Sequence, residues 1–187
     1  MSTSNTASNT ASNTASDAAP LPAPHRLIHT HDPLTGAPLL REDTVPINPM
    51  GNGDPSAYGM IYVQDQLKAD PAKALEGPDK TPDTMWVCST GVTSAWIDLP
   101  PKYDSRMAYT TSMSYIVVVL GSVEIGFHDG TSRVLHPGDI YINAASVHKW
   151  GNPTDQWTRL VGFSTPSEEL SIKGQTLDKL LDAKKVF

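Results

Sequence analysis

The stretch SMSYIVVVLGSVEIGF, residues 112–127, decides the fold. Its β-branched and aromatic residues suit a pleated sheet, and Gly121 marks a turn between two strands. The following run, FHDGTSRVLHPGDIYI over residues 127–142, predicts a hairpin with Asp129-Gly130 at its tip, because this dipeptide tolerates the positive φ of a type I′ turn. Short antiparallel strands this close together in sequence predict an all-β barrel or sandwich.

A spaced motif overlaps the end of this region. Pro137, Gly138 and Asp139 are followed after eight residues by His148, and after three more by Asn152. The same residues at the same spacing make up the second motif of the cupin family, which this stretch therefore resembles.

Residues 108–125 resemble the first motif of the single-domain fungal and bacterial cupins of the RmlC-like superfamily. Thr110, Ser112, Tyr115 and Glu124 set the register. The resemblance implies an all-β, cupin-type double-stranded β-helix, which is a jelly-roll barrel. Leucines at 177, 180 and 181 add a short amphipathic C-terminal helix within residues 175–185, because such positions share one side of a helix.

The departures from the family pattern concern its metal ligands. Positions 108, 110 and 114 differ by even numbers, so their side chains point to one face of an extended strand. The resemblance implies metal ligands at these positions, with the second-motif histidine opposite. Here they hold Ala108, Thr110, Ser114 and His148. A catalytic metal needs about three strong protein ligands, so we predict a cupin without a metal or other cofactor.

Two alternatives stay open at this point. A ligand relocated to His128, His136 or Asp98 would restore a weak metal site and a metal-dependent dioxygenase or lyase. Alternatively, His148 is a relic of a lost site in a non-catalytic cupin that binds small molecules.

The leading prediction is acid/base chemistry at His148. Burial in an apolar barrel lowers the pKa of an imidazole, so at neutral pH it can accept a proton and return it. Thr110 and Ser114 complete the predicted catalytic set by donating hydrogen bonds to a developing enolate. This chemistry suits a lyase or isomerase that performs dehydration, decarboxylation, isomerisation or cyclisation. The resemblance implies a small carbonyl or polyketide-like substrate in secondary metabolism.

Five further residues are predicted to contact the substrate. Trp96 could stack on a flat ligand, although packing in the core is the alternative. Arg159 could bind a substrate carboxylate with its planar guanidinium, although an exposed position at a sheet edge is the alternative. The predicted substrate-binding residues are Trp96, Ala108, Ser112, Trp150 and Arg159.

The domain boundaries follow from composition. Residues 1–18 repeat Thr, Ala, Ser and Asn, so we predict a disordered tail over 1–24 and one cupin domain over 25–187, with its barrel core at 86–164. Residues 41–58 are rich in Pro, Asn and Gly and predict a long surface loop before a strand.

Charge and composition limit the partners. The 187 residues carry a net charge of −6 without a Lys/Arg cluster, which disfavours nucleic acids and anionic membranes. The single cysteine, Cys88, favours a reducing compartment, and neither a long apolar run nor a signal-peptide pattern is present. We expect a cytoplasmic protein with a small-molecule substrate. The resemblance implies a homodimer.

Overall fold

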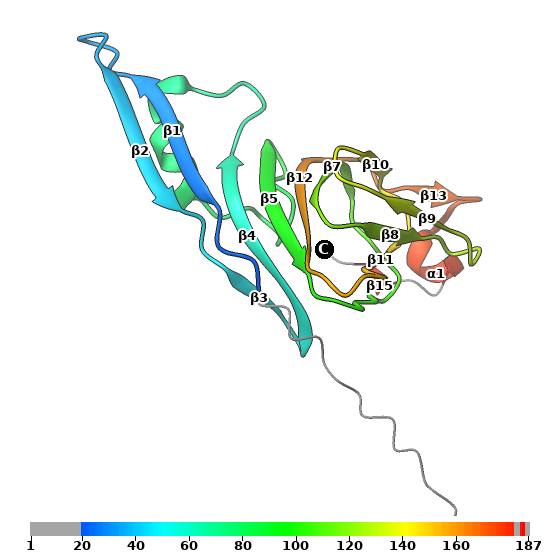
Figure 1. Ribbon diagram of the computed structural model, residues 1–187. Helices are drawn as coiled ribbons and strands as arrows, with labels where there is room; N and C mark the ends of the chain where they lie inside the picture. Colours follow the sequence, from blue (N-terminus) through cyan, green and yellow to red (C-terminus); the bar gives the residue numbers. More distant parts are fainter. Residues whose placement is uncertain (1–19, 182–183, 186–187) are drawn as a thin grey trace, which may run out of the picture.

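The computed structural model describes residues 20–181 and 184–185 (Figure 1). Most of the predicted disordered tail, residues 1–19, therefore lies outside the described residues. The proposed boundaries of the domain stay a prediction. Within the described part of the chain, no helix is long and apolar enough to cross a membrane.

Two antiparallel sheets build the barrel. The larger has the strand order β10-β7-β12-β5-β4-β3, and the smaller has the order β11-β8-β9. The strands of the larger sheet are β3 (Asn48–Gly51), β4 (Asp54–Gln64), β5 (Val92–Leu99), β7 (Ser112–Leu120), β10 (Ile140–Ala144) and β12 (Thr158–Pro166). Those of the smaller are β8 (Val123–Gly126), β9 (Ser132–Leu135) and β11 (Lys149–Gly151). This architecture confirms the predicted all-β jelly-roll barrel.

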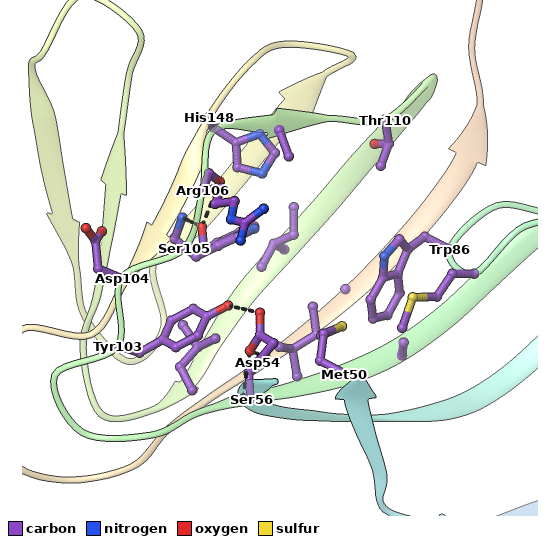
Figure 2. A pocket seen from close by; sticks show the side chains of 18 of the residues that line it. Met50, Asp54, Ser56, Trp86, Tyr103, Asp104, Ser105, Arg106, Thr110 and His148 are labelled. Carbon is purple, nitrogen blue, oxygen red and sulfur yellow. Dashed lines mark hydrogen bonds between the residues drawn. The ribbon is translucent and has the colours of Figure 1, made fainter. Parts of the chain in front are cut away.

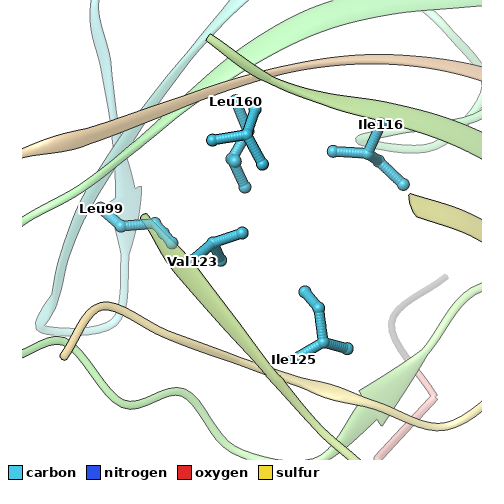
Figure 3. Close-up of a cluster of buried hydrophobic side chains, with 6 residues drawn as sticks. Leu99, Ile116, Val123, Ile125 and Leu160 are labelled. Atoms are coloured by element: carbon cyan, nitrogen blue, oxygen red, sulfur yellow. The ribbon is translucent and has the colours of Figure 1, made fainter. Parts of the chain in front are cut away.

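The barrel core lies between these sheets (Figure 3). Alternate residues of β7 and β12 point inward, so Val118 and Leu160 are buried while Val119 and Phe163 are half exposed on the outer face. The buried cluster consists of Leu99, Ile116, Val118, Val123, Ile125 and Leu160. Inward alternation of apolar side chains is what the sequence pattern over residues 112–127 predicts. The expected homodimer stays a prediction.

An N-terminal hairpin stands beyond β4, at the far side of the larger sheet from the barrel (Figure 1). It consists of β1 (His25–His31) and β2 (Pro38–Thr44), and the 3-10 helix η1 (Pro71–Asp79) packs against β1 and β4. The buried side chain of Arg26 joins this hairpin to β4. Its guanidinium donates to both carboxylate oxygens of Asp43 on β2, at 2.7 Å, and to the Ile61 carbonyl on β4, at 2.6 Å.

The predicted surface loop over residues 41–58 is wrong. Strand β2 ends at Thr44, β3 covers Asn48–Gly51 and β4 begins at Asp54. The prolines and glycines that suggested a loop occupy strand ends, a tight turn and an irregular β3–β4 pairing. In this range β2 pairs with β1 and β3 pairs with β4, and β4 in turn pairs from Ala57 onward with β5, which is distant in sequence.

The β8–β9 hairpin forms as predicted, but its turn is not type I′. Gly130 has φ of +82°, whereas Asp129 is not among the described non-glycine residues with positive φ. The turn closes through bonds from Phe127 N to Thr131 O at 2.8 Å and from Gly130 N to Phe127 O at 3.0 Å. Asp129 Oδ1 also accepts from the Thr131 backbone at 2.9 Å, and this local bond favours an Asp in ordinary backbone conformation.

The C-terminal segment docks on the barrel. Its elements are β13 (Ser171–Ile172), β14 (Gln175–Thr176), α1 (Leu177–Leu181) and β15 (Lys184–Lys185), and β15 pairs in parallel with β6 (Ala108–Tyr109). Leu177 is buried against Tyr109 and Val147. The predicted short C-terminal helix is therefore confirmed, with one turn of helix rather than a longer element.

Candidate functional site

A cavity of about 630 Å³ opens into the barrel. Its walls come from β5, β7, β12 and the segment over residues 100–110, and Figure 2 shows the polar side chains that reach it. A volume of this size is typical of a site for a small organic ligand.

The structure brings the two motifs together at this cavity. Ala108 and His148 exchange backbone hydrogen bonds, with Ala108 N to His148 O at 2.9 Å and His148 N to Ala108 O at 3.0 Å. Ala108, Thr110, Ser114 and His148 all line the cavity, and so does Trp150. Five of the eight predicted site residues therefore meet at one place.

His148 is enclosed by aromatic rings. Its ring centroid lies 5.1 Å from that of Trp150 and 5.8 Å from that of Tyr141, with edge-to-face geometry. Burial lowers the pKa of His148 below its usual value of 6.5, although a hydrogen bond to the Ser146 carbonyl partly opposes the shift. The neutral imidazole is therefore the form that this environment favours at pH 7.

Both neutral tautomers of His148 have a partner at Nδ1. Asn143 Oδ1 accepts from the Ser146 backbone N–H at 2.8 Å, which directs the Asn143 amide nitrogen at His148 Nδ1, 2.9 Å away. The Ser146 carbonyl oxygen lies 3.0 Å from the same Nδ1. Nδ1 can thus donate to Ser146 or accept from Asn143, which leaves Nε2 free to carry either a lone pair or a proton.

The Nε2 edge of His148 is open to chemistry. Within the described residues, its hydrogen bonds involve Nδ1, and Nε2 is not among the buried polar atoms without a partner. Since His148 lines the cavity, Nε2 is the ring nitrogen that a bound ligand can reach. The sequence analysis did not predict that Asn143 contacts His148, although the two residues are only five positions apart in the chain.

A chain of four hydroxyl groups runs along the cavity wall. Thr110 Oγ1 lies 2.6 Å from Ser112 Oγ, which lies 3.0 Å from Ser114 Oγ, which in turn lies 3.0 Å from Ser164 Oγ. Each O–H can donate to one neighbour, so a chain with three links leaves one O–H for a ligand at one end and free lone pairs at the other. Ser112 is buried inside this chain and does not line the cavity, which corrects its predicted contact with substrate.

The donor set does not fit the metal that cupin first motifs hold. Among the residues that the structure describes, no three His, Cys, Asp or Glu side chains lie close enough together to bind a metal ion. His128 and His136 are exposed outside the cavity, and Asp98 is paired on the outer face of the sheet. None of the relocated ligands considered from the sequence therefore joins His148.

Trp96 and Arg159 are not among the described residues that line the cavity, against the expectation that they contact the substrate. Arg159 donates to both oxygens of Asp98, at 2.7 and 2.6 Å, and its guanidinium lies 4.7 Å from the centre of the Trp96 ring. All three point away from the barrel, because the inward-facing neighbours on β5 are Ala95, Ile97 and Leu99. Trp96 is fully buried in packing, as its alternative interpretation held.

Sequence reasoning also missed a polar group at the cavity. Tyr103 donates to Asp54 Oδ2 at 2.8 Å, and Asp54 Oδ1 accepts from the backbone and hydroxyl of Ser56 at 2.9 and 2.6 Å. Burial raises the pKa of Tyr103 to about 12, so the phenol stays protonated. Arg106 and Trp86 also reach the cavity (Figure 2). Asp54 and Trp86 lie in stretches without a recognisable motif.

Comparison with known proteins finds that this chain is similar to cupin-domain proteins. No protein-family model matches this chain. A curated relative, a cupin-domain-containing oxidoreductase of Neurospora crassa, is 27% identical over 160 residues, which cover 83% of this chain and 80% of that protein. Phomopsin biosynthesis cluster protein D of Diaporthe leptostromiformis is 30% identical over 82 residues, which cover 43% of each protein. The matched region thus spans less than half of this second relative.

The solved structures that resemble this chain include cupins. An RmlC-like cupin from Shewanella frigidimarina has a TM-score of 0.45 and 17% sequence identity, covering 67% of this chain and 86% of that structure.

Proposed function

We propose that this chain is a cupin enzyme that uses His148 as a general acid and base on a small carbonyl substrate, without a metal. The observation that carries the proposal is the surroundings of His148: a buried neutral imidazole with Nδ1 held at both a donor and an acceptor, and Nε2 open to the cavity. The name of the phomopsin-cluster relative supports a role in secondary metabolism.

The proposed first step is proton abstraction next to a carbonyl group. In the tautomer with a proton on Nδ1, donated to the Ser146 carbonyl, Nε2 has a lone pair that accepts the substrate proton. The C–H electron pair moves into the carbon–carbon bond of an enolate, and negative charge develops on the carbonyl oxygen. The imidazolium that forms keeps its bond to Ser146.

The hydroxyl chain supplies the complementary group. Its terminal O–H, at Thr110 or Ser164, can donate to the enolate oxygen as charge develops there. Return of the proton from Nε2 to another carbon gives an isomerisation, and its delivery to a leaving hydroxyl gives a dehydration. The same pair of groups therefore serves both the lyase and the isomerase classes.

The test is deuterium exchange in heavy water. Chelator-treated protein of measured metal content is incubated with aryl ketones and keto acids that have enolisable C–H bonds, phenylacetone and phenylpyruvate among them, and exchange is followed by NMR. We expect protein-catalysed exchange in the metal-free sample. On acidification the exchange rate should begin to fall only below pH 6.5. The lowered pKa of His148 keeps the imidazole unprotonated, and so able to accept a proton, at pH 6.5 and above. Exchange that appears only with added iron, nickel, manganese or zinc would overturn the metal-free mechanism.

Ser112 provides a second test of this mechanism. Ser112→Ala removes the central link between Thr110 and Ser114, so we expect catalysed exchange to fall about tenfold, with a loss of stability of about 1–2 kcal/mol. Ser167→Ala is the matched control, because within the described part of the chain its hydroxyl donates only to the adjacent Glu168 carbonyl, at an exposed position. Unchanged exchange in Ser112→Ala would remove the hydroxyl chain from the mechanism.

A small-molecule-binding cupin without catalysis is the second candidate. It is favoured by the internal satisfaction of the hydroxyl chain, in which every member already has a hydroxyl partner. This candidate predicts binding of panel compounds without any exchange above that of a His148 variant.

A further inference from the structure

We infer that the substrate of this cavity carries a carboxylate, and that Arg106 binds it next to His148. The inference deepens the proposed function of the same site and rests on it for the chemistry, but not for the binding itself.

Charge pairing around the cavity singles out Arg106. Among the described lining residues, the Asp, Lys and Arg side chains are Asp54, Lys102, Asp104 and Arg106. Lys102 pairs with Asp155 at 3.1 Å, and Asp104 accepts from Lys149 at 2.7 and 2.9 Å. Both carboxylate oxygens of Asp54 are occupied by Tyr103 and Ser56. The Arg106 guanidinium makes no hydrogen bond or ion pair with any residue in the described ranges.

The backbone holds Arg106 beside His148 and the strand β11 that follows it. On one side of it, Ser105 N donates to the Trp150 carbonyl at 2.8 Å and Trp150 N donates to Ser105 Oγ at 2.8 Å. On the other side, Ala108 and His148 exchange backbone bonds. Figure 2 shows the Arg106 side chain entering the cavity on the His148 side. An anion bound by Arg106 therefore lies within reach of chemistry at Nε2.

The chemistry of the site favours a carboxylate on an apolar body. A single guanidinium presents two parallel N–H donors, which match the two oxygens of a carboxylate. A phosphate carries more charge and would favour a second cation. The other cation at this cavity, Lys102, is already paired with Asp155. The remaining wall includes Trp86, Met107 and Ile97, which suit an aromatic or aliphatic skeleton.

The test compares phenylpyruvate with phenylpyruvamide, which replaces the carboxylate by a neutral amide. Binding is measured by isothermal titration calorimetry on the full chain, with quenching of tryptophan fluorescence as a second readout. We expect the protein to bind the acid about tenfold more tightly than the amide, because a hydrogen bond to a charged partner at a partly exposed site has about this effect. Arg106→Gln should abolish the preference by weakening only the acid, and Arg106→Lys should keep part of it.

Arg133→Gln is the matched control, since Arg133 is exposed and lies outside the cavity. It should leave both affinities unchanged. The inference is overturned if the protein does not prefer the acid over the amide, or if Arg106→Gln binds the acid as tightly as the unmodified chain.

The design separates this inference from the proposed catalysis. If the acid preference is present and depends on Arg106, but no exchange occurs, the carboxylate site stands and catalysis fails. If phenylacetone exchanges in a reaction that needs His148 while the acid preference is absent, catalysis stands and the carboxylate site fails.

Discussion

His148→Gln is expected to lower the rate of protein-catalysed deuterium exchange by roughly 10²–10⁴-fold, the range that a positioned general acid or base contributes. The glutamine amide can still donate and accept hydrogen bonds near the position of Nε2, but it cannot take up a proton and return it. The loss should therefore appear in turnover, while affinity for phenylpyruvate changes little. The measurement is exchange by NMR, with circular dichroism to confirm folding.

His128→Gln is the matched control, because His128 is exposed and lies outside the cavity. It should exchange at the rate of the unmodified chain. If His148→Gln retains full activity, His148 is not the catalytic residue. If neither the unmodified chain nor His128→Gln catalyses exchange of any compound in the panel, the small-molecule-binding cupin without catalysis replaces the enzyme as the proposed function.

Asp98→Ala is expected to lower the free energy of unfolding by about 3–5 kcal/mol, the cost of breaking a buried ion pair from one side. Asp98 and Arg159 are 4% and 13% exposed and directly opposed across β5 and β12, so the variant leaves a buried guanidinium without its carboxylate. Stacking on Trp96 remains but does not neutralise the charge. Urea denaturation measures the loss.

Two variants make this prediction specific. Glu42→Ala removes an exposed partner of His25 and should change stability by less than about 1 kcal/mol, because surface ion pairs contribute little. The double variant Asp98→Leu with Arg159→Met should recover most of the loss, since apolar side chains can replace a buried pair. An Asp98→Ala protein as stable as Glu42→Ala would show that solvent reaches the pair.

The absence of a suitable donor set explains how the site differs from a metal-binding cupin. Side-chain alternation predicts Ala108, Thr110 and Ser114 on one face, and all three line the cavity beside His148. None of them is a strong metal ligand.

The sequence by itself determined the strands over residues 112–126 and the turn at Gly121. These follow from side-chain alternation and turn chemistry, which act between neighbours along the chain. The identity of the residues at positions 108, 110 and 114 likewise settled the weakness of the metal ligand set, because it depends only on side-chain type.

Only the tertiary structure decided which face of β5 and β12 is inside. Trp96 and Arg159 alternate as regularly as Ala95 and Leu160, and the choice depends on which face the smaller sheet covers. The same holds for the groups around the cavity. Asp54 reaches Tyr103 across 49 residues of chain. Among the described residues the Arg106 guanidinium has no partner, and the two carboxylates of the cavity, Asp54 and Asp104, already accept from other residues. Such pairings depend on packing between distant segments, which alternation along one strand does not encode.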